Sequence, residues 1–240
     1  MTTGTQIIEL AEKVDAELRE LMASRTMPLY DMMAYHLGWG ERPGPTDSRD
    51  LEDRKHGVLC LVSCMAIGAR VDEALPAAAA VELVHKFCQI HDDVQGGNPK
   101  RGNRDTVWWI WGPAQAINAG DGMHALARLA LLRLADQGVP SEKIFHGIQI
   151  LDQACLKMCE GRFLDLEAQE RIDDVIVGNA MPEGSQGLNM ARLISLICLR
   201  YFSLCLSKIS LVCLSTVMAI ISSDIPIIAL SASRLLPRLF

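Results

Sequence analysis

Two adjacent carboxylates, Asp92 and Asp93, followed closely by the basic run Lys100 to Arg104, form the stretch of the sequence best suited to chemistry. Mg²⁺ prefers oxygen ligands and is usually held by one or two carboxylates together with substrate phosphates. Arginine and lysine side chains nearby can neutralise the remaining phosphate charge. The pattern therefore suits the binding of a diphosphate through a metal ion. The alternative is a solvated acidic pair at the end of a helix, followed by an ordinary basic loop.

The segment from Val81 to Asp93 is predicted to be the helix that positions these carboxylates. Its apolar residues recur at helical spacing. Four polar residues at i, i+3, i+7 and i+10 share another face of the same helix. They are Glu82, His85, Gln89 and Asp92. Pro76 is well placed as the first residue of this helix, because proline is favoured in the first helical turn.

The composition predicts one helical domain rather than a sheet protein. The chain has 240 residues, of which 50% are hydrophobic and only 5% are aromatic. A domain of this size can bury a full core, and its abundant alanine and leucine favour helices. The formal net charge of −6 argues against a general nucleic-acid binder.

The cysteines and the N-terminus predict a cytoplasmic protein. The eight cysteines show no metal-finger spacing, and two i, i+4 pairs, Cys60/Cys64 and Cys155/Cys159, fall inside apolar helical patterns. Buried free thiols of this kind fit a reducing compartment. The first residues lead into an acidic amphipathic helix rather than an apolar secretory leader.

Other helices are predicted on both sides of the central one. Gly57 to Gly68 is almost entirely apolar and should be buried. A long helix should run from Pro113 to about Asp136, with Ile117 on its buried side, and another from Pro140 to about Arg171. Gly161 lies late in this last helix, where a glycine implies close packing or a bend.

The chain changes character near residue 180. We therefore divide it into a helical domain at 1–180, incomplete for its type, and an atypical apolar tail at 181–240. From Gln186 onward there are five basic residues and one acid, a charge of +4, whereas the preceding residues carry −10. The uncharged run Ile209 to Ile221 is shorter than the roughly 20 residues of a membrane span, so membrane contact through the tail is not favoured. A shifted reading frame is one hypothesis for the tail.

The span from about residue 50 to 170 resembles the trans-isoprenyl diphosphate synthases, also called the polyprenyl synthetase family. The ordered matches are Glu82 to Gln95, Arg101, Thr106 to Trp108, Trp111 to Asp121 (W-G-P-A-Q-A-I-N-A-G-D) and Glu160 to Leu166 (E-G-R-F-L-D-L). The resemblance implies an all-α, antiparallel helical bundle of the isoprenoid synthase type around a central cavity. It also implies a homodimer.

The resemblance further implies a prenyltransferase that condenses an allylic diphosphate with isopentenyl diphosphate through Mg²⁺-assisted departure of the diphosphate. Carried over by position, Asp92 and Asp93 would be metal ligands. Arg101 would contact the allylic diphosphate. Gly102 stands where a second arginine usually follows it, with Lys100 in front of Arg101 as a substitute. Substrate-binding roles toward isopentenyl diphosphate fall to two further residues, His85 and Arg54.

Several positions depart from the family pattern. Gly96 stands where the first aspartate-rich motif has its third aspartate, and Arg162 stands in place of a glutamine. The second aspartate-rich motif is absent. These departures leave three other hypotheses open, namely a class I terpene cyclase on the same fold, a truncated non-catalytic helical subunit, and a membrane-associated helical protein.

Overall fold

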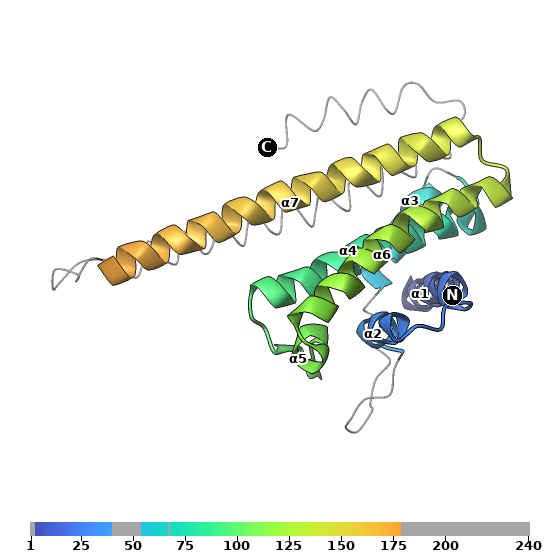
Figure 1. The fold of residues 1–240 in the computed structure, drawn as a ribbon. Coiled ribbons are helices and arrows are strands. Elements are labelled where there is room, and N and C mark those ends of the chain that lie inside the picture. The colour runs from blue at the N-terminus through green and yellow to red at the C-terminus, as the bar shows by residue number, and fades with distance from the viewer. Residues whose placement is uncertain (1–2, 40–53, 67, 179–240) are drawn as a thin grey trace, which may run out of the picture.

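The computed structural model describes residues 3–39, 54–66 and 68–178, and within these ranges the side chains from residue 5 to residue 169. The chain is helical apart from one short hairpin (Figure 1). The α-helices are α1 (Thr3–Met22), α2 (Pro28–His36), α3 (Lys55–Ala66), α4 (Leu75–Gln95), α5 (Val107–Trp111), α6 (Pro113–Leu132) and α7 (Ser141–Gly178). The short elements are the 3₁₀ helices η2 (Val71–Ala74) and η3 (Arg133–Gln137) and the strands β1 (Lys100–Arg101) and β2 (Arg104–Asp105).

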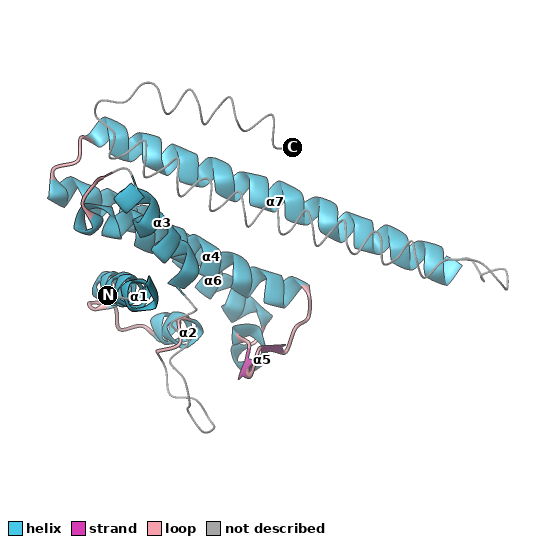
Figure 2. Ribbon diagram, turned by 180° about the vertical axis from the view of Figure 1, so that it is seen from behind, coloured by secondary structure: helices cyan, strands magenta, loops and turns pink. Residues whose placement is uncertain are grey.

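Helix α4 lies at the centre of the described bundle. It packs along α6, which runs antiparallel to it, and α3 and α1 cover its other sides (Figure 1). Helix α7 returns over α6 and extends beyond the other described helices, as the view from behind also shows (Figure 2). The predicted all-α class and antiparallel arrangement are confirmed, whereas the central cavity stays a prediction.

Small residues allow the helices to approach α4 closely. The first part of the helix is a run of alanines, Ala77 to Ala80, each at most 2% exposed. Gly57 of α3 sits in the same contact, because a Cβ atom added there would lie 2.8 Å from Cγ1 of Val14 and 3.2 Å from the carbonyl oxygen of Ala78. Small residues at these contacts therefore set the close spacing of α1, α3 and α4.

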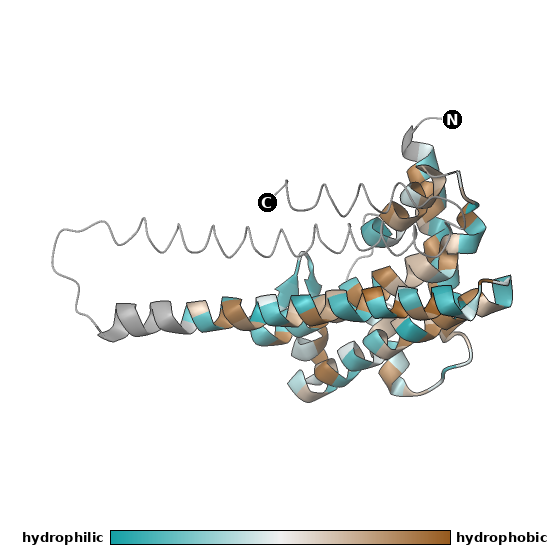
Figure 3. Cartoon of the chain, turned by 90° about the horizontal axis from the view of Figure 1, so that it is seen from above, coloured by the Kyte–Doolittle hydropathy of each residue, from teal (hydrophilic) through white to brown (hydrophobic). Residues whose placement is uncertain are grey.

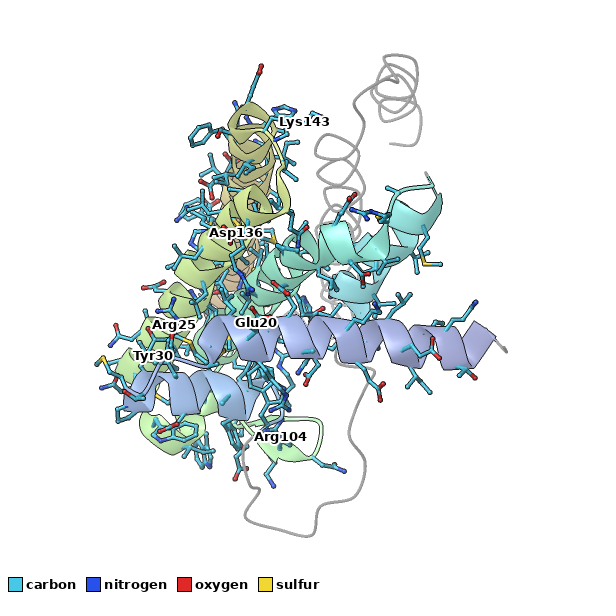
Figure 4. The ribbon with its side chains drawn as sticks, turned by 90° about the vertical axis from the view of Figure 1, so that its right-hand side faces the viewer. Glu20, Arg25, Tyr30, Arg104, Asp136 and Lys143 are labelled. Carbon is cyan, nitrogen blue, oxygen red and sulfur yellow. The ribbon has the colours of Figure 1, made fainter. Side chains whose placement is uncertain are left out.

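The hairpin after α4 is tied to α2 and α5 by hydrogen bonds. Tyr35 Oη donates to the carbonyl oxygen of Asp105 at 2.9 Å, and Arg104 donates back to the carbonyl oxygen of Tyr35. The Arg104 guanidinium also lies over the Tyr35 ring, beneath α2 (Figure 4). Trp108 Nε1 and Thr106 Oγ1 both donate to the carbonyl oxygen of Asn98, which closes the loop.

Most of the predicted helices are confirmed. The helix predicted from Pro113 to about Asp136 ends at Leu132 and continues as the 3₁₀ helix η3, and Cys159, predicted as a buried thiol, is exposed. Ile117 was expected on the buried side of α6 but is 43% exposed, so that prediction is wrong. Helix α7 continues to Gly178, beyond the predicted end near Arg171. Residues 179–240, which include the predicted tail, lie outside the described residues. None of the described helices is both long enough and apolar enough to cross a membrane.

Helix α7 has an apolar side that no other described helix covers. Hydrophobic and hydrophilic residues alternate along its length (Figure 3). Its exposed large apolar residues are Phe145, Leu156, Phe163 and Leu164. A neighbouring side of the helix packs inward through Ile144, Leu151 and Cys155. Among the described helices, α7 is therefore packed on one side only.

We predict that Gly57→Ala destabilises the protein by about 1–3 kcal/mol, because the new methyl group would meet Val14 and backbone that cannot move freely. The measurement is the free energy of unfolding in urea, followed by circular dichroism. Gly122→Ala is the matched control, since its Cβ would meet no backbone atom but only the ends of the Met33 and Leu29 side chains. A Gly57→Ala protein as stable as the parent would show that α1, α3 and α4 do not pack this closely.

Candidate active site

The Asp93 side chain, at the end of α4, forms an ion pair with Arg101 of the hairpin. The guanidinium donates to both carboxylate oxygens, from Nε to Oδ2 at 3.1 Å and from Nη2 to Oδ1 at 2.8 Å. The Asp93 side chain is only 3% exposed, whereas that of Arg101 is 43% exposed. A fork of this kind is among the stronger hydrogen-bonded pairs in proteins. Arg101 therefore holds one predicted metal ligand in place.

Asp92 points the other way, toward α7. Its Oδ1 lies 3.5 Å from Nε of Arg162, and the same guanidinium donates from Nη1 to Oδ2 of Asp165 at 2.6 Å. Nε of Arg162 also donates to Oε1 of Gln95 at 2.8 Å. The arginine thus bridges two carboxylates that come from α4 and α7.

Burial shifts the titration of both aspartates in the same direction. It raises the pKa of Asp92, and the charges of Arg162 and Arg101 oppose the rise. It also raises the pKa of Asp93, against the hydrogen bond and charge of Arg101. A carboxylate removed from water keeps its charge only with cations nearby. These two groups are therefore suited to binding a cation, and here arginines supply it.

Further back on α4, a buried polar row faces α3. Glu82 is fully buried, and its Oε2 accepts a hydrogen bond from the backbone nitrogen of Gly57 at 2.9 Å. The Lys86 side chain is 1% exposed, with Nζ 4.0 Å from Oε1 of Glu82 and 3.3 Å from Oε1 of Gln89. Burying a charge is costly unless it is paired, so this row must form for α4 to pack.

Three histidines from α2, α3 and α4 gather beside this row. The rings of His56 and His85 stack with centroids 3.8 Å apart. Burial lowers the pKa of His85 to about 2, and the charges of His56 and Lys86 act in the same direction. Burial also holds the pKa of His36 well below its ordinary value. Among the described residues, nothing hydrogen-bonds to Nδ1 of His85.

Arg54 lies at the start of α3, where it joins three elements. Its Nη2 donates to Oδ1 of Asp15 and to the carbonyl oxygen of Leu37, both at 2.6 Å. The guanidinium lies 5.8 Å from the centroid of the Trp39 ring, and Trp39 Nε1 also donates to Asp15. The side chain is 5% exposed. Arg54 therefore ties α1 and the end of α2 to α3, and its substrate-binding role stays a prediction.

The structure brings some predicted site residues together and separates others. Asp92 and Asp93 both lie at the end of α4, and Arg101 pairs with Asp93, whereas His85 lies further back along the same helix. Lys100 is exposed on β1. The sequence reasoning missed the pairing of Arg162 with Asp92. Its signal was present in the E-G-R-F-L-D-L segment, but only the fold shows which helix that segment faces.

The carboxylates fit Mg²⁺ in part. Asp92 and Asp165 both contact one cationic group, so their oxygens face a common point, and oxygen is the ligand atom that Mg²⁺ prefers. Among the described residues, however, no three histidine, cysteine or acidic side chains are arranged to hold a metal ion. Phosphate oxygens of a bound substrate would have to complete the coordination shell.

The chain is similar in sequence to known proteins over more than half of its length. The polyprenyl synthetase family model matches residues 54–179. A geranylgeranyl diphosphate synthase of Mycobacterium tuberculosis is 38% identical over 157 residues, which cover 65% of this chain and 44% of that protein. A short chain isoprenyl diphosphate synthase of Methanocaldococcus jannaschii is 38% identical over 158 residues, covering 66% of this chain and 43% of the other.

Solved structures show the same likeness. A polyprenyl synthetase from Streptomyces coelicolor has a TM-score of 0.60 at 32% identity, over 70% of this chain and 48% of that one. A geranylgeranyl pyrophosphate synthetase from Geoglobus acetivorans has a TM-score of 0.66 at 25% identity, over 91% of this chain and 61% of that one. The chain belongs to the polyprenyl synthetase family. It spans less than half the length of the two curated relatives described above.

The buried histidines predict a loss of stability in mild acid. In the unfolded chain they bind protons as the pH falls through about 6.5, whereas the lowered pKa values keep His85 and His36 neutral in the folded state. The free energy of unfolding is therefore not reduced by these histidines above pH 6.5, and it decreases as the pH falls below 6.5. We expect His85 to remove about 2 kcal/mol between pH 7 and pH 5, and His36 to act in the same direction.

The measurement is the free energy of urea unfolding at several pH values in that range. His85→Gln, which cannot take up a proton, should flatten the slope. His146→Gln, an exposed histidine on α7, is the control for the substitution itself. An unchanged slope in His85→Gln would contradict the buried, neutral state of His85.

Proposed function

We propose that the protein is a prenyltransferase that condenses an allylic diphosphate with isopentenyl diphosphate. Family membership through residues 54–179 supports this proposal, as do relatives named as geranylgeranyl and short chain isoprenyl diphosphate synthases. The observation that carries it is the placement of Asp92 within that matched segment, at the end of α4 and facing Asp165 and Arg162 of α7. Carboxylates and a guanidinium in one place suit a diphosphate held through a cation.

The diphosphate of the allylic substrate would bind at the end of α4. When bound there, Mg²⁺ would neutralise the diphosphate and favour its departure as a leaving group. Asp92 would supply oxygens to the metal, and Asp93, fixed by Arg101, is the second proposed ligand. The exposed part of Arg101 and the neighbouring Lys100 would contact the phosphate oxygens. Charge that develops on the leaving group would then face cations already in position.

The second diphosphate would bind near His85 and Lys86. His85 stays neutral because its pKa is about 2, so it would bind phosphate as a hydrogen-bond donor rather than as a cation. Its buried Nδ1, which has no hydrogen-bond partner among the described residues, is the atom that would do so. Arg54 would support this region by holding α3 in place, and direct contact with isopentenyl diphosphate stays part of the proposal.

The location of the protein, its oligomeric state and its partners are inferred from the same family membership. We propose a cytoplasmic homodimer that takes small diphosphates as its substrates and binds no nucleic acid. The net charge of −6 supports the last point. Terpene cyclisation and a purely structural role are less favoured, because the relatives described above are named as synthases and a synthetase.

The test is a product assay on the full chain, with Mg²⁺, labelled isopentenyl diphosphate and geranyl or farnesyl diphosphate. We expect a longer prenyl diphosphate that disappears with a chelator. Asp92→Ala should lower the rate by at least about 100-fold, because loss of a metal contact removes charge stabilisation from the transition state. Asp136→Ala, an exposed acid on η3 at the far end of α6 (Figure 4), is the matched control and should keep the parent rate.

Other outcomes would reject the proposal. A cyclic hydrocarbon formed without uptake of isopentenyl diphosphate would make the protein a terpene cyclase. No product from a folded, helical sample would make it a non-catalytic member of the family.

A further inference from the structure

The guanidinium of Arg162 occupies the point where the two helices present their carboxylates to each other. It lies against Asp92 of α4 and Asp165 of α7, at 3.5 and 2.6 Å. All three side chains are shielded to a similar extent, with 21%, 19% and 17% of Arg162, Asp92 and Asp165 exposed. The Arg162 guanidinium is thus close to the surface, with a carboxylate on each side.

An arginine at this point is a permanent cation. Its side chain does not lose its proton in proteins, so the charge between the two carboxylates is present at every working pH. A divalent ion bound to the same oxygens would lie within a few ångströms of this charge. Like charges at such separations repel strongly in a partly buried site, and the arginine would therefore weaken metal binding.

The same arginine keeps donors available for an anion. Nε is used by Gln95 and Asp92, and Nη1 by Asp165. Within the described part of the chain, Nη2 donates to no acceptor. A planar guanidinium with a donor left over is well matched to phosphate oxygens, which it binds in a fixed geometry.

We propose that Arg162 is a built-in cation that takes over part of the role of a metal ion, binding the substrate's diphosphate directly while lowering the affinity of the Asp92 site for divalent metal. This inference rests on the proposed function only in naming a diphosphate as the ligand. It makes Arg162 a further substrate-binding residue and the determinant of how much metal the site requires. The resemblance leads one to expect glutamine at this position of the E-G-R segment. The arginine found there would therefore add a cation that binds diphosphate and weakens metal binding.

The test uses the full chain and two binding measurements that need no turnover. Calorimetry gives the affinity for inorganic pyrophosphate in the presence of a chelator, and electron paramagnetic resonance gives the affinity for Mn²⁺ in its absence. For Arg162→Gln we expect pyrophosphate binding without metal to weaken by about tenfold or more. Mn²⁺ binding should tighten by about tenfold in the same variant. Arg162→Lys, which keeps the charge but loses the planar fork, should weaken pyrophosphate binding while leaving Mn²⁺ binding weak.

Lys157→Gln is the matched control, because Lys157 is an exposed cation on the same helix, and its one partner among the described residues is Glu160. It should bind both ligands as the parent does. Unchanged affinities for both ligands in a folded Arg162→Gln protein would overturn the inference, even if the prenyltransferase assay succeeds. If that assay fails and the two affinities still shift in opposite directions, the inference stands and the proposed reaction is wrong. If Arg162→Gln does not fold, Arg162→Lys decides, and its pyrophosphate affinity must then fall below that of the parent.

Discussion

The structure depends on burying a helix that carries charge. Helix α4 packs against α1, α3 and α6, and yet Glu82, Lys86 and Asp93 are each almost completely covered. A buried charge must be paired or it destabilises the fold by several kcal/mol. Each of these residues therefore has a partner of opposite charge, either within α4 or, for Asp93, from the hairpin that follows it. The charged groups of α4 that are available for chemistry are therefore held in place by the pairs that allow the helix to be buried.

Fold and site are linked most closely at the end of α4. The helix ends in two carboxylates that face different neighbours, and each meets an arginine from another element. Arg101 comes from β1, which follows a short loop, whereas Arg162 comes from α7, far along the chain. The same contacts thus orient the hairpin, dock α7 and set the electrostatics of the diphosphate site that we propose. A change in one of these arginines should therefore alter both stability and ligand binding.

Much of this could be predicted from local patterns. The helical period of residues 81–93 gave α4, and the ordered match to the polyprenyl synthetase family gave the fold class. The sequence could not predict partners, because pairings such as Asp92 with Arg162 depend on where α7 returns in space. It also misjudged Ile117, which fits the apolar stripe of α6 but faces outward. Periodicity identifies the apolar side of a helix, and tertiary packing decides how much of that side is covered.

The central claim is that Asp92 and Arg162 interact directly across α4 and α7. A double-mutant cycle tests it most directly, with urea unfolding of the parent, Asp92→Asn, Arg162→Gln and the double variant. Because both side chains are about 20% exposed, we expect a coupling of about 1 kcal/mol at low ionic strength, decreasing as salt is added. Additive effects, within about 0.3 kcal/mol at low salt, would contradict the account.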